Sequence, residues 1–169
     1  MKNVIVYKGK YGATEQYAKW LSEVLLCPVY EAGSEPEALI QTADTVILGT
    51  SVYIGKLQLK QWISNHGTQL ISKKIFLFVV CGTPDSQHEK RMVWIKQNIP
   101  PSLLPSCQVF FLQGRLKMSK LSWKDRLLLK IGARLSPDPI ERKNMLTEYD
   151  DVKKENLQPL LAAITRTVS

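Results

Sequence analysis

Two glycines, two lysines and a threonine near the start of the chain have the spacing of an anion-binding turn. The segment is Lys8-Gly9-Lys10-Tyr11-Gly12-Ala13-Thr14, and it follows the apolar run 4–7. Unpaired backbone N–H groups at a helix start, together with the helix dipole, attract phosphates and carboxylates. Thr14 opens an amphipathic segment and is placed to cap that helix. The pattern predicts a strand, a turn and a helix that bind an anion; the alternative is an ordinary turn without a ligand.

Other sequence patterns for catalysis are missing. The turn lacks the Gly-Lys-Ser/Thr end of a Walker loop, and it is not a G-x-G-x-x-G turn. His66 and His88 stand alone, and Cys27, Cys81 and Cys107 lack the spacing of metal ligands, so no metal site is expected. If the protein is an enzyme, we therefore expect a cofactor to supply the chemistry.

Five apolar runs alternate with helical segments along the chain. This order predicts an α/β fold, with a doubly wound parallel sheet covered by helices on both faces. The last helix has Asp150 as a plausible N-cap and should bend at Pro159. The expected strands are 4–7, 28–32, 44–49, 74–80 and 108–112, and the helices begin at Thr14 and span 35–40, 57–70, 87–98 and 150–165.

Ligands of such sheets bind beyond the carboxyl ends of the strands, which selects the loops after strands one, three and four. Tyr53 is the aromatic side chain of the second loop, and the alternative is a half-buried tyrosine that closes a turn. In the third loop Cys81 is a core residue or a reactive one, and the loop itself is a ring-binding segment or a plain turn. The two loops comprise Thr50, Ser51, Val52, Tyr53, Ile54 and Gly55, and Cys81, Gly82 and Thr83.

The first turn resembles the FMN-phosphate signature of flavodoxins. Gly9 departs from it, because that family usually has Ser or Thr there. The lost hydroxyl would cost about 1–2 kcal/mol, which Lys8 and Lys10 could offset. The resemblance implies a five-stranded sheet in the order 2-1-3-4-5, FMN as cofactor with its phosphate on 8–14, and Tyr53 as a platform for the flavin ring. The matching residues are Ile5, Val6, Tyr7, Gly12, Thr14, Ala18 and Leu21.

The segment 115–148 is too long for an ordinary connection and is strongly basic. Between Arg115 and Leu135, seven Lys or Arg residues face the single acid Asp125, which accounts for six of the chain's eight net positive charges. Ser122 and Asp125 have capping-box spacing. We expect a basic amphipathic helix, Leu121 to Leu135, that sits on an anionic membrane or packs as a lid over the site.

This segment also resembles the tail of bacterial menaquinone-dependent protoporphyrinogen IX dehydrogenases. The resemblance implies an FMN-dependent oxidoreductase that oxidises protoporphyrinogen IX with a quinone as acceptor. A soluble electron-transfer protein of the flavodoxin type and a non-catalytic binding module are the alternatives. The matching stretches are Gly114-Arg115-Leu116, Trp123-Lys124-Asp125-Arg126-Leu127, Lys130-Ile131, Glu141-Arg142-Lys143 and Thr147-Glu148-Tyr149.

Bulk properties are those of one globular domain, which we expect to span 1–169 with an insertion at 115–148. The chain has 169 residues, of which 44% are hydrophobic and 22% charged. The cysteines are odd in number and lie in apolar stretches, which favours a reduced, intracellular compartment. We expect a cytoplasmic protein, at the inner face of the membrane if the basic helix binds lipid. The net charge of +8 favours a carboxylate-bearing substrate or anionic lipid, with a redox protein as the other possible partner and nucleic acid not expected.

Overall fold

The fold is built on a parallel sheet, as the alternating pattern predicts. A computed structural model describes residues 2–83 and 85–166. The sheet order is β2-β1-β3-β5-β6, so the predicted order of five parallel strands is confirmed. A short strand, β4, adds an antiparallel hairpin to β3. The strands are β1 (Asn3–Lys8), β2 (Val29–Glu31), β3 (Thr45–Tyr53), β4 (Lys56–Leu57), β5 (Lys74–Cys81) and β6 (Cys107–Gln113).

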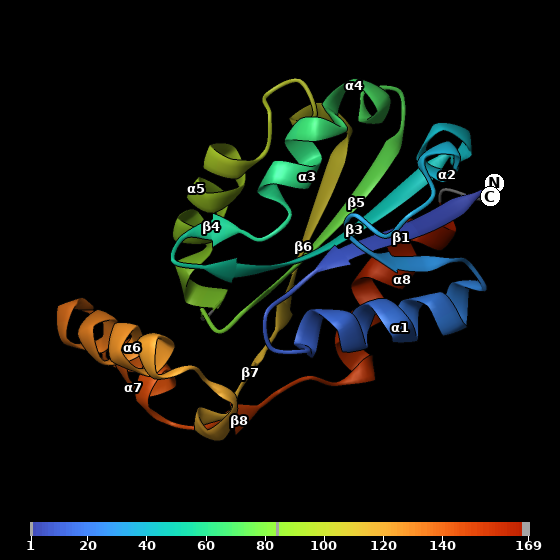
Figure 1. Cartoon of the computed structure of the whole chain (residues 1–169). Helices are drawn as coiled ribbons and strands as arrows, with labels where there is room; N and C mark the ends of the chain where they lie inside the picture. Colours follow the sequence, from blue (N-terminus) through green and yellow to red (C-terminus); the bar gives the residue numbers. More distant parts are fainter. Residues whose placement is uncertain (1, 84, 167–169) are drawn as a thin grey trace.

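Helices cover both faces of this sheet (Figure 1). Strand residues alternate between two cores, so that Val46 and Leu48 pack on one side while Ile47 packs on the other. Helices α1 (Ala13–Leu25) and α8 (Gln158–Arg166) close one core. The opposite core is closed by α2 (Glu37–Thr42), α3 (Lys60–Asn65), α4 (Gly67–Leu70) and α5 (His88–Asn98). Short 3₁₀ turns complete these connections: η1 (Asp85–Gln87), η2 (Leu104–Ser106) and η4 (Lys154–Leu157).

Two predicted helices differ from the structure. The helix expected over 57–70 is divided at His66 into α3 and α4, and its first residue, Leu57, belongs to β4. The helix expected from Asp150 starts only at Gln158, because Asp150 instead pairs with Arg115 in a small antiparallel ribbon. Pro159 therefore lies in the first turn of α8, where a missing N–H breaks no helical hydrogen bond, and no bend is needed.

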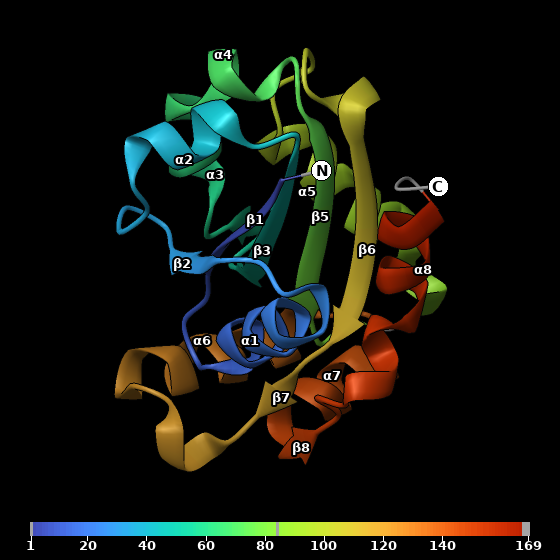
Figure 2. The same ribbon diagram turned by 90° about the vertical axis from the view of Figure 1, so that its right-hand side faces the viewer.

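The inserted segment lies beyond the carboxyl ends of the strands (Figures 1 and 2). It consists of β7 (Arg115–Leu116), η3 (Met118–Lys120), α6 (Trp123–Leu135), α7 (Pro139–Leu146) and β8 (Tyr149–Asp150). The predicted basic helix is confirmed as α6, capped by Ser122, whose Oγ accepts from Asp125 N at 3.2 Å. The second helix, α7, was not predicted. The sequence does contain a signal for its start, because Asp138 is an N-cap residue directly before Pro139 at the first helical position.

Helix α6 buries little of its own surface. Only Asp125 and Ala133 are buried in it, while Trp123 and Leu135 are 70% and 78% exposed. Gly132 approaches α7 closely, since a Cβ there would lie 3.4 Å from Met145 Sδ. In the described part of the chain, no helix has the length and apolar character needed to cross a membrane.

Candidate functional site

The three predicted loops meet at one cavity at the carboxyl edge of the sheet. The cavity has a volume of about 170 Å³. Its walls also include residues to which the sequence assigned no site role, above all Arg115 and Tyr149 from the β7–β8 ribbon. Only the pairing of that ribbon brings them to the site. The predicted residues that line the cavity are Lys10, Tyr11, Ala13, Thr14, Ser51, Val52, Tyr53, Cys81 and Gly82.

The other predicted residues lie around this cavity without lining it. Lys8 is exposed at the end of β1, and Thr50 is buried, with its Oγ1 accepting from Leu59 N at 3.2 Å. Thr83 is buried, and its carbonyl accepts from Arg91. Gly9 and Gly12 shape the first turn, and Ile54 and Gly55 form the tip of the β3–β4 hairpin.

The first turn has the shape of an anion cradle. Gly12 adopts a left-handed conformation (φ 82°) and is the N-cap of α1, so Thr14 is the second helical residue and not the cap that the sequence predicted. No hydrogen bond in residues 2–83 and 85–166 uses the N–H of Lys10 to Glu15 as donor. These N–H groups therefore remain available to an anion.

Gly9 and Thr14 are packed against each other inside this turn. A Cβ on Gly9 would lie 2.6 Å from Thr14 Oγ1 and 2.7 Å from Thr14 Cβ. Thr14 is only 1% exposed, so it has little room to move away. The departure from the flavodoxin signature at Gly9 is thus accompanied by a threonine that occupies the space a side chain would need.

The loop predicted after the third strand is a tight hairpin. Strand β3 continues to Tyr53, and the chain reverses through Ile54 (φ 52°) and Gly55 (φ 70°) into β4. Two successive positive φ values are typical of the type I′ turn that suits antiparallel strands. A β-branched residue rarely adopts this conformation, so Ile54 is strained. The hairpin fixes Tyr53 at the edge of the cavity.

Asp125 of α6 joins the first turn to this hairpin. Its carboxylate accepts from the hydroxyls of Tyr11 and Tyr53, and Lys10 Nζ lies 2.8 Å from its Oδ2. The residue is 4% exposed. Lys10 Nζ also lies 3.8 Å from the centroid of the Tyr53 ring, so a cation covers one face of the predicted platform.

These contacts shift the pKa values of Asp125 and Lys10. Burial alone raises the pKa of Asp125, but hydrogen bonds from Lys10, Tyr11, Tyr53 and Ser122 outweigh burial and hold it well below its usual range. Burial likewise lowers the pKa of Lys10, but its bonds to Asp125 and Tyr53 raise the pKa well above its usual value. The pair is therefore ionised at neutral pH.

Tyr149 closes the cavity from the side of the insertion. Its hydroxyl lies 2.0 Å from where a Cβ of Gly82 would be, so only glycine fits at that position. Burial, with smaller effects from Cys81 and Asp151, raises the pKa of Tyr149 to about 12. The phenol is therefore protonated at neutral pH and can donate a hydrogen bond.

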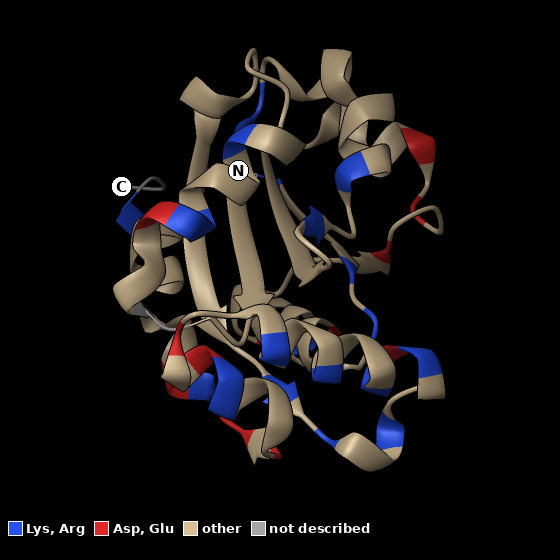
Figure 3. Ribbon diagram, turned by 90° about the vertical axis from the view of Figure 1, so that its left-hand side faces the viewer, with Lys and Arg blue, Asp and Glu red and all other residues tan. Residues whose placement is uncertain are grey.

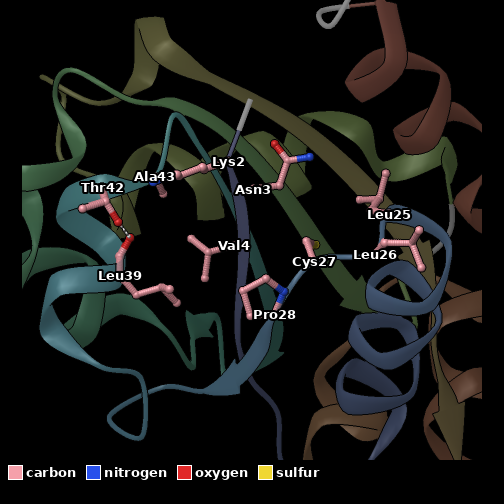
Figure 4. Close-up of a pocket in the computed structure, with 10 residues that line it drawn as sticks. All are labelled: Lys2, Asn3, Val4, Leu25, Leu26, Cys27, Pro28, Leu39, Thr42 and Ala43. Atoms are coloured by element: carbon pink, nitrogen blue, oxygen red, sulfur yellow. Dashed lines mark hydrogen bonds between the residues drawn. The ribbon is translucent and has the colours of Figure 1, made fainter.

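A larger cavity, of about 410 Å³, lies at the opposite, amino end of the strands (Figure 4). Its walls include Val4, Cys27, Pro28 and Leu39, and burial raises the pKa of the Cys27 thiol to about 11. It contains no part of the three loops. Among residues 2–83 and 85–166, no cluster of His, Cys, Asp or Glu could hold a metal ion. The cavity at the three loops is therefore the candidate functional site.

Comparisons with known proteins bear on the family of the chain. The sequence matches the family model described as "Flavodoxin domain" over residues 4–139. No match to a curated protein was found. A flavodoxin from the domain Archaea is 13% identical, with a TM-score of 0.45 over 71% of this chain and 88% of its own.

Two further solved structures are similarly distant. A flavoprotein from Bacteroides eggerthii is 17% identical, with a TM-score of 0.47 over 77% of this chain and 96% of its own. The Trp repressor binding protein from Bacillus subtilis is 12% identical, with a TM-score of 0.44 over 67% and 83%. Structural similarity with such low sequence identity and TM-scores supports no conclusion about function.

Proposed function

Since the chain belongs to the flavodoxin-domain family, with FMN as its cofactor, we propose that it is an oxidoreductase that oxidises a porphyrinogen, with a quinone as acceptor, beside an anionic membrane surface. We assign the whole chain to one such domain, with 115–148 as its insertion. The observation that carries this proposal is the attachment of the basic helix α6 to both cofactor loops through Asp125.

The residues around the cavity fit FMN. The unpaired N–H groups of the first turn suit a phosphate, and Thr14 and Lys10 line the same cavity. Tyr53, Val52 and the loop at Cys81 and Gly82 would hold the flavin ring. When bound, FMN supplies a centre that accepts and gives electrons. The chain's own part is to position that group, exclude water and provide the cationic and phenolic side chains around it.

The substrate assignment is supported by the inserted segment. The stretches that resemble protoporphyrinogen dehydrogenases include Arg115 and Tyr149, which line the cavity. Basic side chains in and near the cavity, including Lys10 and Arg115, complement the carboxylates of a porphyrinogen. In each two-electron step the porphyrinogen would give up two electrons and two protons, and one quinone would take up both to become a quinol. Three such steps remove four C–H bonds, one from each bridging carbon, and two N–H bonds.

The exposed side of the insertion suits an anionic membrane. Trp123, Leu127, Ile131 and Leu135 are exposed on α6, and Lys and Arg positions recur along the same helix (Figure 3). Apolar burial and attraction of cations to anionic lipid act together at such surfaces, each cation adding about 1 kcal/mol before screening. A quinone dissolved in the bilayer would then be close to the cavity.

The absorbance spectrum of the purified protein tests the cofactor assignment, with FMN titration of cofactor-free protein followed by quenching of flavin fluorescence. A colourless protein that does not quench FMN fluorescence at micromolar concentration contradicts it. Anaerobic stopped-flow absorbance then tests the reaction, with protoporphyrinogen IX added to oxidised protein and a menaquinone analogue added to reduced protein. If neither reacts while a flavodoxin reductase does so quickly, the protein is an electron shuttle.

A further inference from the structure

A second cavity lies next to the first, between the sheet and the inserted helices. Its volume is about 200 Å³. The insertion contributes Leu116, Leu129 and Met145 to its walls, and Trp94 of α5 faces them from the main domain. The lining is mainly apolar, with one large aromatic ring, which suits a flat apolar ligand.

The two cavities share a wall. Val52, Cys81, Gly82 and Tyr149 line both of them. A ligand in the second cavity would therefore be separated from a ligand in the first by single side chains or backbone. This short separation is what electron transfer between two bound molecules requires.

The Tyr149 hydroxyl is the polar group at this shared wall. It lies over the Cα of Gly82, and the described residues offer it no hydrogen-bond partner. The hydroxyl is therefore free to donate a hydrogen bond to a ligand in the cavity that Tyr149 lines. A ligand with a carbonyl oxygen would accept this hydrogen bond.

Polar contacts at the edges of this second cavity fix the position of α7 over it. Glu141 of α7 is bonded to Lys90 of α5 and accepts from Ser136 Oγ at 2.7 Å. Asn144 Nδ2 donates to Gly82 O at 3.2 Å. These contacts connect the inserted helices to α5 and to the third loop, and they leave an apolar cavity between them. We interpret this cavity as a binding site.

We infer that this second cavity binds the ring of the quinone acceptor, with Tyr149 donating a hydrogen bond to a quinone carbonyl. The inference rests on the proposed function and adds the place where the acceptor binds. The lining supports a ring system, because the Trp94 ring lies among apolar side chains of the insertion.

Equilibrium dialysis of the oxidised, FMN-loaded protein against dimethylnaphthoquinone tests this inference without turnover. Both free carbons of the quinone ring are methylated in this probe, so it cannot add to the thiol of Cys81. Leu129→Trp fills the cavity and should abolish measurable binding. Tyr149→Phe keeps the ring and removes the hydroxyl, and it should weaken binding about tenfold, the loss expected for one hydrogen bond.

Leu128→Trp is the matched control, because Leu128 is the neighbouring residue on α6 and is exposed. It should bind the probe like the unchanged protein. Far-ultraviolet circular dichroism confirms that each variant is folded, and FMN affinity serves as a second control for the two leucine variants, whose residues do not line the first cavity. Unchanged binding in Leu129→Trp overturns the cavity assignment, and unchanged binding in Tyr149→Phe overturns the role of the hydroxyl. Probe binding without any quinone reduction in stopped-flow instead contradicts the proposed reaction and leaves the site standing.

Discussion

Lys10 Nζ and Asp125 Oδ2 lie 2.8 Å apart and join the anion-binding turn to the inserted helix. Lys10 is partly exposed, whereas the Asp125 side chain is almost fully buried. The same carboxylate holds Tyr11 and Tyr53, so one acidic side chain ties three donors from two loops to α6. The insertion and the cofactor site therefore cannot move independently while this contact persists.

We expect Asp125→Asn to loosen α6. The substitution replaces an ionised acceptor with an amide whose NH₂ faces donors, and the loss of a charged, buried hydrogen-bond partner costs about 1–3 kcal/mol. Amide hydrogen exchange in 123–146 should accelerate more than exchange in the sheet. Lys130→Gln, a charge change on the exposed part of the same helix, should leave exchange unchanged. Equal protection in Asp125→Asn and the unchanged protein would show that Asp125 is not the anchor.

The pH dependence of this anchor follows from the lowered pKa of Asp125. The contact stabilises the fold above the pKa of an unfolded aspartate, near 3.9, and its contribution is lost as the pH falls toward the folded pKa. Exchange protection of α6 should therefore be constant from neutral pH to about pH 5 and fall below about pH 4. In Asp125→Asn this acid-dependent part should be missing.

Restoring the serine that flavodoxins usually have at Gly9 should weaken FMN binding. A Cβ there collides with Thr14, and overpacking of this kind costs about 1–3 kcal/mol, or about five- to 150-fold in affinity if the strain falls on the binding turn. FMN titration by fluorescence quenching measures it. The double variant Gly9→Ser/Thr14→Gly, which removes both colliding atoms, Thr14 Oγ1 and Cβ, should bind more tightly than Gly9→Ser alone. Tighter binding by the single variant would contradict the packing explanation.

Tyr149 should contribute to alkaline unfolding. Its pKa is raised from 10.0 to about 12, so the protonated phenol stabilises the fold fully below pH 10 and this contribution is lost as the pH rises to 12. Thermal unfolding of Tyr149→Phe should depend less on pH in that window. The thiols of Cys27 and Cys107, with pKa values raised to about 11 and about 12, titrate in both proteins, so the comparison isolates the phenol. If the unfolding temperatures of the two proteins fall equally with pH between 10 and 12, Tyr149 does not contribute to alkaline unfolding.

Vesicle flotation tests the membrane surface. Lys130→Glu/Arg134→Glu reverses two exposed charges and should reduce binding to anionic vesicles more than 100-fold at low salt, because each cation contributes about 1 kcal/mol and its reversal costs as much again. Lys2→Glu/Arg166→Glu, the same charge change near the opposite end of the molecule, should bind normally. Binding should fall with salt, since charges on the surface are screened within a Debye length. Without binding at low salt, α6 is only a lid.

Local sequence patterns determined the sheet and the place of the site. Apolar runs such as Ile75 to Val80 had to be buried on both faces, which requires a parallel sheet with helices on each side. The rule for parallel sheets then selected three loops, and the structure brings all three to one cavity. Their role in binding FMN stays a prediction.

Only the tertiary structure decided what the insertion does to that site. The spacing of Ser122 and Asp125 indicated a capping box, and Ser122 does cap α6, but the Asp125 carboxylate turns to Lys10, Tyr11 and Tyr53. Tyr149 likewise reaches Gly82 only because β8 pairs with β7. Local patterns report hydrogen bonds within a few residues of chain, whereas these partners are brought together by packing between segments that the sequence separates widely.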